Sequence, residues 1–155
     1  MNSKKYLLMV AVVFNAALAN LAIAEEHQHH EMGEQILQLN HGVKWSIDAS
    51  LHQGMTNIRQ QLMLNLDDIH YDKFSKAQFL ALANDFDQQL NYLFENCQLS
   101  PKADAQLHVL LAKIMQGNEL IKNAQNKKQG AVMIMQALQD YPVYFNDEKW
   151  QEVSH

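Results

Sequence analysis

Three histidines stand close together near the start of the chain: His27, His29 and His30, with glutamates on both sides. Imidazole is a ligand for copper, nickel, zinc and iron. A histidine that is third from a free amino terminus offers more, because the terminal amine, two backbone amides and the imidazole then surround one ion in a plane. Copper(II) and nickel(II) favour this square-planar geometry, and copper binds more tightly. The spacing therefore predicts a copper site, with nickel or zinc less favoured, provided that the chain is cut two residues before His27.

The residues before this tract have the three parts of a secretory signal peptide. Two lysines lie within the first five residues, an apolar run follows, and small residues end at Ala24. We expect cleavage after Ala24, which makes Glu25 the first residue and His27 the third. The apolar run is too short and interrupted for a permanent span, which needs about 20 apolar residues. The mature chain is therefore expected in the periplasm and off the membrane.

The same tract has a plainer interpretation. Short histidine-rich tracts bind metals in vitro whether or not the cell uses them, so residues 25–47 are predicted as a flexible arm and lead-in segment whose metal role stays open. If the arm does hold copper, the expected role is sequestration or delivery. Affinity should then fall below about pH 6.5, because imidazole must be neutral to bind a metal.

Charge and length limit the class of protein. Removing residues 1–24 takes away two lysines and no acid, so the formal charge of −5 becomes −7. Such a surface repels nucleic acid, and no basic stripe offsets it. The chain of 155 residues less the leader of 24 leaves 131, enough for one domain. The single cysteine, Cys97, cannot form an internal disulfide, so we expect it to be buried, bound, or paired with another chain.

Helices must position any further site, because glycine and proline are scarce after the leader. Apolar residues recur at three- and four-residue steps in four stretches. Their members are Leu51, Met55, Ile58, Leu62, Leu66 and Ile69; Phe79, Ala83, Phe86, Leu90, Leu93 and Cys97; Leu107, Leu110, Leu111, Ile114 and Ile121; and Ala131, Val132, Met135 and Leu138. Ser75 predicts the start of the second helix, Ser100 that of the third and Asn126 that of the fourth, with Pro142 stopping or kinking the last.

Four such stripes bury best in an all-α, antiparallel up-and-down four-helix bundle with a short N-terminal arm. We assign residues 1–24 to the signal peptide, 25–47 to the arm and lead-in, and 48–155 to the bundle. A short turn of helix is expected within 34–46, before a loop at Asn40-His41-Gly42. Four aromatic residues are expected to cover the bundle: Trp45, Tyr144, Phe145 and Trp150.

Two stretches, residues 39–59 and 96–108, resemble a family of small exported helical proteins of proteobacteria. The family pattern reads L-x-x-G-x-x-W-x-x-D-x-x-L-x-x-G-M-x-x-I-R, followed by N-C and later by L-H. Its anchors in this chain are Gly42, Trp45, Asp48, Leu51, Gly54, Met55, Ile58, Arg59, Cys97 and His108. His52 stands where the pattern has arginine. The resemblance implies export and a helical fold, and it carries no expectation about activity.

The bundle geometry places one more candidate site at one end of the molecule. Met55 and His108 are expected at similar heights, and Cys97 nearer the bundle end at the height of Asp104, with His52 at the same end. Sulfur and imidazole ligands suit copper, and a methionine facing a histidine can hold haem iron axially. The alternative is ordinary packing, because Met55 and Cys97 lie within apolar stripes. Haem is the less favoured ligand, since no C-x-x-C-H attachment motif is present.

No catalytic motif supports an enzyme. The sequence contains no G-x-S-x-G, no H-E-x-x-H and no phosphate loop. Acidic neighbours such as Asp67 and Asp68 are expected to be solvated, because adjacent helical positions diverge by about 100°. We therefore expect no enzyme activity. Two functions compete: a periplasmic metal-binding protein, and a helical interaction module that binds an unknown protein or dimerises through an apolar seam or Cys97.

Overall fold

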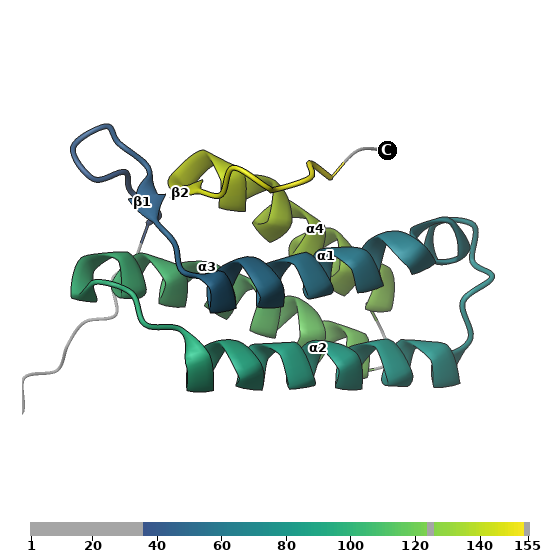
Figure 1. The fold of residues 1–155 in the computed structure, drawn as a ribbon. Helices are drawn as coiled ribbons and strands as arrows, with labels where there is room; N and C mark the ends of the chain where they lie inside the picture. Colours follow the sequence, from purple (N-terminus) through teal and green to yellow (C-terminus); the bar gives the residue numbers. More distant parts are fainter. Residues whose placement is uncertain (1–35, 124–125, 154–155) are drawn as a thin grey trace, which may run out of the picture. The chain divides into compact units, whose positions relative to one another are not determined.

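Four long helices fold back on one another: α1 (Ala49–His70), α2 (Lys76–Asn96), α3 (Pro101–Lys122) and α4 (Lys127–Tyr144). The computed structural model describes residues 36–123 and 126–153, all within one compact unit. Helices that are neighbours in sequence pack together, and α1 also contacts α4 (Figure 1). The predicted all-α four-helix bundle is confirmed. Among the described residues, no helix is long and apolar enough to cross a membrane.

The first three helices begin at side chains that cap them. Asp48 begins α1 by accepting the backbone N–H of Leu51 at Oδ1, 2.7 Å away. Ser75 begins α2 with a reciprocal capping box to Gln78, and Ser100 begins α3, both as predicted. Each cap satisfies an N–H group that lacks a partner within its helix and is worth about 1 kcal/mol. Asp48 has no glutamine three residues on, so the sequence pattern does not single it out.

The fourth helix differs from its prediction in detail. Asn126 stands at the N-cap position as predicted, but its side chain makes no capping hydrogen bond. Val132, which the periodicity assigns to the buried stripe, is 49% exposed. Pro142 lies inside the last turn, and α4 continues past it to Tyr144. The proline therefore does not end the helix where it stands.

Helices α3 and α4 approach each other closely where two glycines meet. A Cβ atom on Gly117 would lie 2.7 Å from the backbone oxygen of Gly130. That distance is shorter than van der Waals contact, so any side chain at this crossing would push the two backbones apart. The inner faces of all four helices close one apolar core around it, whose fully buried members include Met55, Phe86 and Leu110.

The lead-in segment, residues 36–47, contains no helix, so the predicted helical turn is wrong over the residues that the structure describes. Asn40 and Val43 pair their backbones, and the two residues between them have positive φ angles, 52° at His41 and 86° at Gly42. A right-handed helix excludes such angles. The predicted loop at these positions is confirmed.

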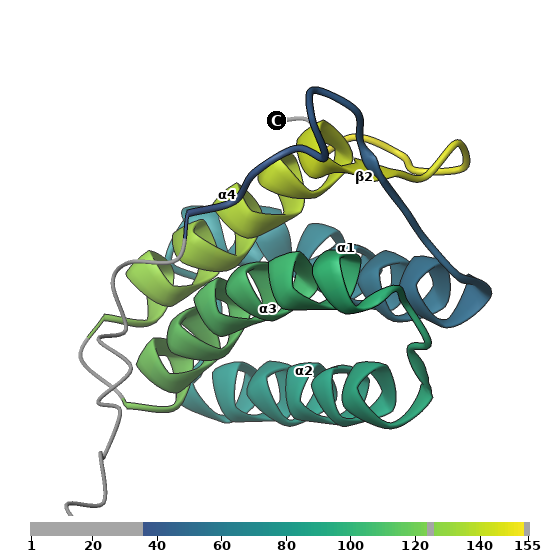
Figure 2. The ribbon, with the colours of Figure 1, turned by 90° about the vertical axis from the view of Figure 1, so that its left-hand side faces the viewer.

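Two hydrogen bonds attach the lead-in segment to the bundle. The backbone N–H of Gln38 donates to Oε1 of Gln106 on α3 at 2.7 Å. Nε1 of Trp45 donates to the backbone oxygen of Gln38, also at 2.7 Å. Leu37 beside them is only 6% exposed. The lead-in segment is therefore attached to α3, and its dark-blue trace passes across α4 in the view of Figure 2.

A short parallel ladder joins the two ends of the described chain. Strand β1 (Trp45–Ser46) pairs with β2 (Phe145–Asn146), and Trp45 lies opposite Phe145. Both aromatic side chains are buried, and Trp150 packs against the same core. The aromatic residues expected to cover the bundle therefore do so through a strand pairing that the sequence does not predict.

Candidate functional site

The histidine tract and the bundle end are the two candidate sites that the sequence predicts. His27, His29 and His30 lie outside the described residues. Within residues 36–123 and 126–153, no three histidine, cysteine, aspartate or glutamate side chains lie close enough together to hold a metal ion. Cys97 and His108 therefore belong to no such cluster.

Met55 lies at the centre of the apolar core and has no exposed surface. Its helix neighbours Leu51 and Ile58 are equally enclosed. A thioether in such surroundings packs as an apolar side chain. A metal at this sulfur would have to displace packed core atoms.

Cys97 is the C-cap residue of α2 and is partly buried. Burial, together with the nearby carboxylates of Asp48 and Asp104, raises the pKa of its thiol from 9.0 to about 12. The thiolate is the form that attacks electrophiles and binds metals. At neutral pH, Cys97 is therefore a protonated thiol among acids, which suits neither task.

His108 lies on the outer side of α3. Its Nδ1 is 2.9 Å from the backbone oxygen of Asp104 and 3.4 Å from that residue's carboxylate. The side chain is 54% exposed, and its ring lies 5.7 Å from the ring of Phe94 on α2. An axial methionine–histidine pair needs both side chains at one cavity. An enclosed Met55 and a half-exposed His108 do not provide this arrangement.

A different group of residues gathers at this end, around Asp147. The carboxylate of Asp147 lies 2.8 Å from Nδ1 of His52 and accepts the hydroxyl of Tyr141 at 3.1 Å. It also accepts the backbone N–H of Lys149, and its side chain is only 2% exposed. Burial, followed by the charge of Asp147, raises the pKa of Tyr141 far above its usual value. We call this group, with Cys97 beside it, the strapped end.

The strap is the C-terminal segment, residues 147–153, which runs along α1. Trp150 lies edge-on to Tyr141, with ring centroids 4.7 Å apart. Farther on, the guanidinium of Arg59 donates to the side chain of Gln151 and to the backbone oxygen of Glu152. A histidine held by a buried carboxylate resembles part of a catalytic triad, but burial and the nearby carboxylates of Asp48 and Asp104 keep the thiol of Cys97 protonated. The arrangement binds the strap to α1.

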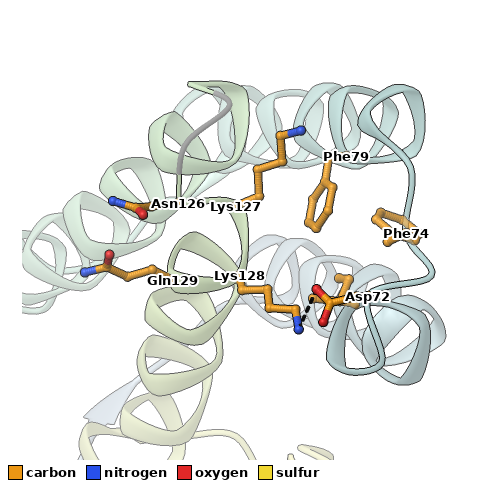
Figure 3. A pocket seen from close by; sticks show the side chains of 8 residues that line it. Asp72, Phe74, Phe79, Asn126, Lys127, Lys128 and Gln129 are labelled. Atoms are coloured by element: carbon orange, nitrogen blue, oxygen red, sulfur yellow. Dashed lines mark ion pairs between the residues drawn. The ribbon is translucent and has the colours of Figure 1, made fainter.

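One hollow lies at the opposite end, beside the start of α4, with a volume of about 490 Å³. Figure 3 shows two lysines in its wall. Lys128 pairs with Asp72 at 2.7 Å, and Nζ of Lys127 lies 5.3 Å from the ring centre of Phe79. Both ammonium groups already have partners, so the hollow presents little free positive charge to an anion.

A second hollow is open along the outer sides of α3 and α4. This thioether groove is about 640 Å³ in volume, and its walls include Met115, Gln116, Glu119, Leu120, Asn123 and Met133. Met115 is 45% exposed and Met133 is partly buried. Among the described residues, Met115 is the one methionine in the exposed class. Two soft sulfur atoms from different helices thus line one accessible groove.

The sequence did not predict Asp147 as the central residue of the strapped end, nor Met115 and Met133 as lining residues of the thioether groove. Asp147 and His52 are 95 positions apart, and nothing local in the sequence links them. A signal for Met115 and Met133 was present in the sequence, because neither residue belongs to the apolar stripes that predict α3 and α4. Comparison of the chain with protein-family profiles, curated proteins and solved structures found no match.

Proposed function

We propose that the mature protein is a non-catalytic periplasmic protein that binds copper through its histidine-rich arm. The observation that carries the proposal is the sequence Glu25-Glu26-His27 directly after the predicted cleavage position. A terminal amine, two amides and the imidazole of His27 supply four nitrogens in a plane, the geometry that Cu(II) prefers. His29 and His30 follow within reach as further ligands.

The fold supports this proposal by fixing where the arm begins. Leu37 is buried and Gln38 is hydrogen-bonded to α3, so the residues before them start from a defined place on the bundle. The acidic mature chain attracts cations to its surface. We assign no metal to Met55, Cys97 or His108, because a packed thioether, a protonated thiol and a lone histidine do not form a shared ligand set.

The test compares Cu(II) affinity in two forms of the untagged protein, the mature chain and a chain that lacks residues 25–30. Competition with a chelator of known affinity gives both constants. We expect the shortened chain to lose the tight site, and His27→Ala to lose most of it. His108→Ala is the matched control and should bind as the parent does. Equal affinity of the mature and shortened chains would end the proposal.

The alternative is a helical interaction module, and one observation favours it. A shallow hollow of about 370 Å³ lies between α1 and α4, with Leu66, Val132 and Met135 in its walls. The half-exposed Val132 is an apolar group that a partner helix would cover. Sedimentation of the metal-free chain distinguishes the two functions. A dimer that dissociates in the Val132→Glu variant, and whose formation does not depend on copper, would support the interaction module.

A further inference from the structure

We propose that the exposed face of α4 is a homodimer interface, on which α4 of a second copy of this chain lies antiparallel. The two copies are related by a two-fold axis that passes between Ala137 and Leu138. The inference does not depend on the proposed copper function. It rests on the α4 surface that favours the alternative function, and it goes further by naming the partner, its direction and the register of the contact.

The exposed face of α4 carries no charged side chain after the first turn of the helix. Between positions 130 and 144, the residues in the exposed class are Val132, Gln136, Gln139 and Val143, which we call the α4 seam. The two valines are 49% and 52% exposed. Steps of four, three and four residues keep all four on one side of the helix. A chain with a formal net charge of −5 thus has one helix face that is uncharged and partly apolar.

The α4 seam reads the same in both directions. Its order is valine, glutamine, glutamine, valine, and its spacing of four, three and four positions is unchanged on reversal. A two-fold axis requires such a surface, because each patch must fit its own copy. In the proposed register, Val132 lies opposite the partner's Val143, and Gln136 lies opposite the partner's Gln139. Apolar side chains then pack on apolar side chains, and each amide can both donate and accept a hydrogen bond.

Shallow hollows at both ends of the α4 seam leave room for the facing valines. The hollow of about 370 Å³ between α1 and α4 lies at the Val132 end and has Leu66 and Met135 in its wall. Another hollow, of about 530 Å³, lies at the Val143 end and has Val153 in its wall. In the antiparallel pair, the partner's Val143 faces the first hollow and the partner's Val132 faces the second. Apolar side chains that fill pockets of this kind contribute most of the stability of an interface.

The charged groups around the α4 seam fit an antiparallel pair. Lys127 and Lys128 lie in the first turn of α4, so a parallel pair would bring them beside their own copies. An antiparallel pair sets that turn beside the partner's last turn, which carries partial negative charge. Lys128 is paired with Asp72 at 2.7 Å. Lys44 and Glu152, which have opposite charges, both lie in the wall of the second hollow. The contact therefore buries no unbalanced charge.

The experiment measures the dimer dissociation constant of the metal-free, untagged mature chain by sedimentation equilibrium. Two double variants at exposed positions separate the proposed register from any other. Gln136→Glu with Gln139→Glu sets like charges opposite each other, and we expect the dissociation constant to rise about a hundredfold or more. Gln136→Glu with Gln139→Lys sets opposite charges there, so the dimer should persist. In a parallel pair each position would face itself, and both variants would dissociate.

A matched control and the fold of the variants complete the design. Leu64→Glu places a charge on α1 at a residue that is 79% exposed and lines neither hollow, so this variant should dimerise as the parent does. Thermal unfolding verifies that each variant is folded.

Three results would overturn the proposal. A parent chain that stays monomeric up to about 1 mM has no such interface. Dissociation of both double variants excludes the antiparallel register, and unchanged dissociation constants in both exclude the α4 seam as the contact. None of these results bears on the proposed function, which depends on the Cu(II) affinity of the arm and is measured separately.

Discussion

At the strapped end, Asp147 is 2% exposed and holds both His52 and Tyr141, whereas in the thioether groove Met115 is 45% exposed and faces open space. The first region has the residue types of an enzyme site: a carboxylate, an imidazole, a phenol and a thiol. Each of these groups either has a hydrogen-bond partner within the fold or stays protonated because of its surroundings. The second region has two thioethers, two amides and the carboxylate of Glu119 among apolar side chains, and one of its thioethers, that of Met115, is exposed. Whether a side chain of this protein is available to a ligand therefore depends on whether it already has a partner within the fold.

The largest expected effect concerns the thiol at the strapped end. A pKa of about 12 in place of 9.0 leaves Cys97 with roughly a thousandth of the thiolate of an exposed cysteine near pH 8. We expect alkylation to be about a thousandfold slower in the native protein than in urea. The linked stability is present below pH 9.0 and is lost as the pH rises toward 12, because the unfolded thiol ionises first. Equal alkylation rates in the native and unfolded states would remove the contrast between the regions.

The second effect is the loss of the buried carboxylate. Asp147→Ala leaves His52 and Tyr141 without their acceptor, which should cost about 3 kcal/mol of the free energy of unfolding. Asp140→Ala is the matched control. It removes an exposed partner of Lys113, 2.9 Å away, and should cost less than about 1 kcal/mol. Urea unfolding measures both variants. Similar costs would mean that the strap contributes little.

The third effect is the pH dependence of the copper site proposed in the histidine-rich arm. Cu(II) at the terminal amine and His27 requires several deprotonated nitrogens, so its affinity should fall about tenfold or more per pH unit below about 6.5. Competition titrations at pH 7 and pH 5 measure this slope, and an affinity that does not change with pH would argue against ligation by imidazole.

The smallest effect compares the helix starts nearest the two regions. Ser100, beside the strapped end, accepts the N–H of Ala103, so Ser100→Ala should cost about 1 kcal/mol. Asn126 makes no capping bond at the start of α4, which supplies Met133 to the groove. Asn126→Ala should therefore change the unfolding free energy by only a few tenths of a kcal/mol. A cost at Asn126 equal to that at Ser100 would contradict the observed caps.

The sequence predicts what local periodicity and capping determine, and it does not predict pairings between distant segments. Ser75 and Ser100 have partners within three residues, so both helix starts were predictable. Asp147 acts on His52 across most of the chain, and no pattern near either residue marks it. The exposed position of Met115 follows from the apolar stripe of α3. Its shared groove with Met133 depends on how α3 and α4 cross, which is a tertiary property.

The pairing of β1 with β2 has a consequence for the order of folding. Trp45 pairs with Phe145, so strand β1 has no partner strand until nearly all of the described chain has been synthesised. Contacts between residues so distant in sequence form late, because a long loop must close first. The helices can form as the chain lengthens, but the ladder and the strap at Asp147 need its final residues. If the chain is exported from its amino terminus, as proposed, β1 stays without its partner strand until Phe145 and Asn146 have crossed the membrane.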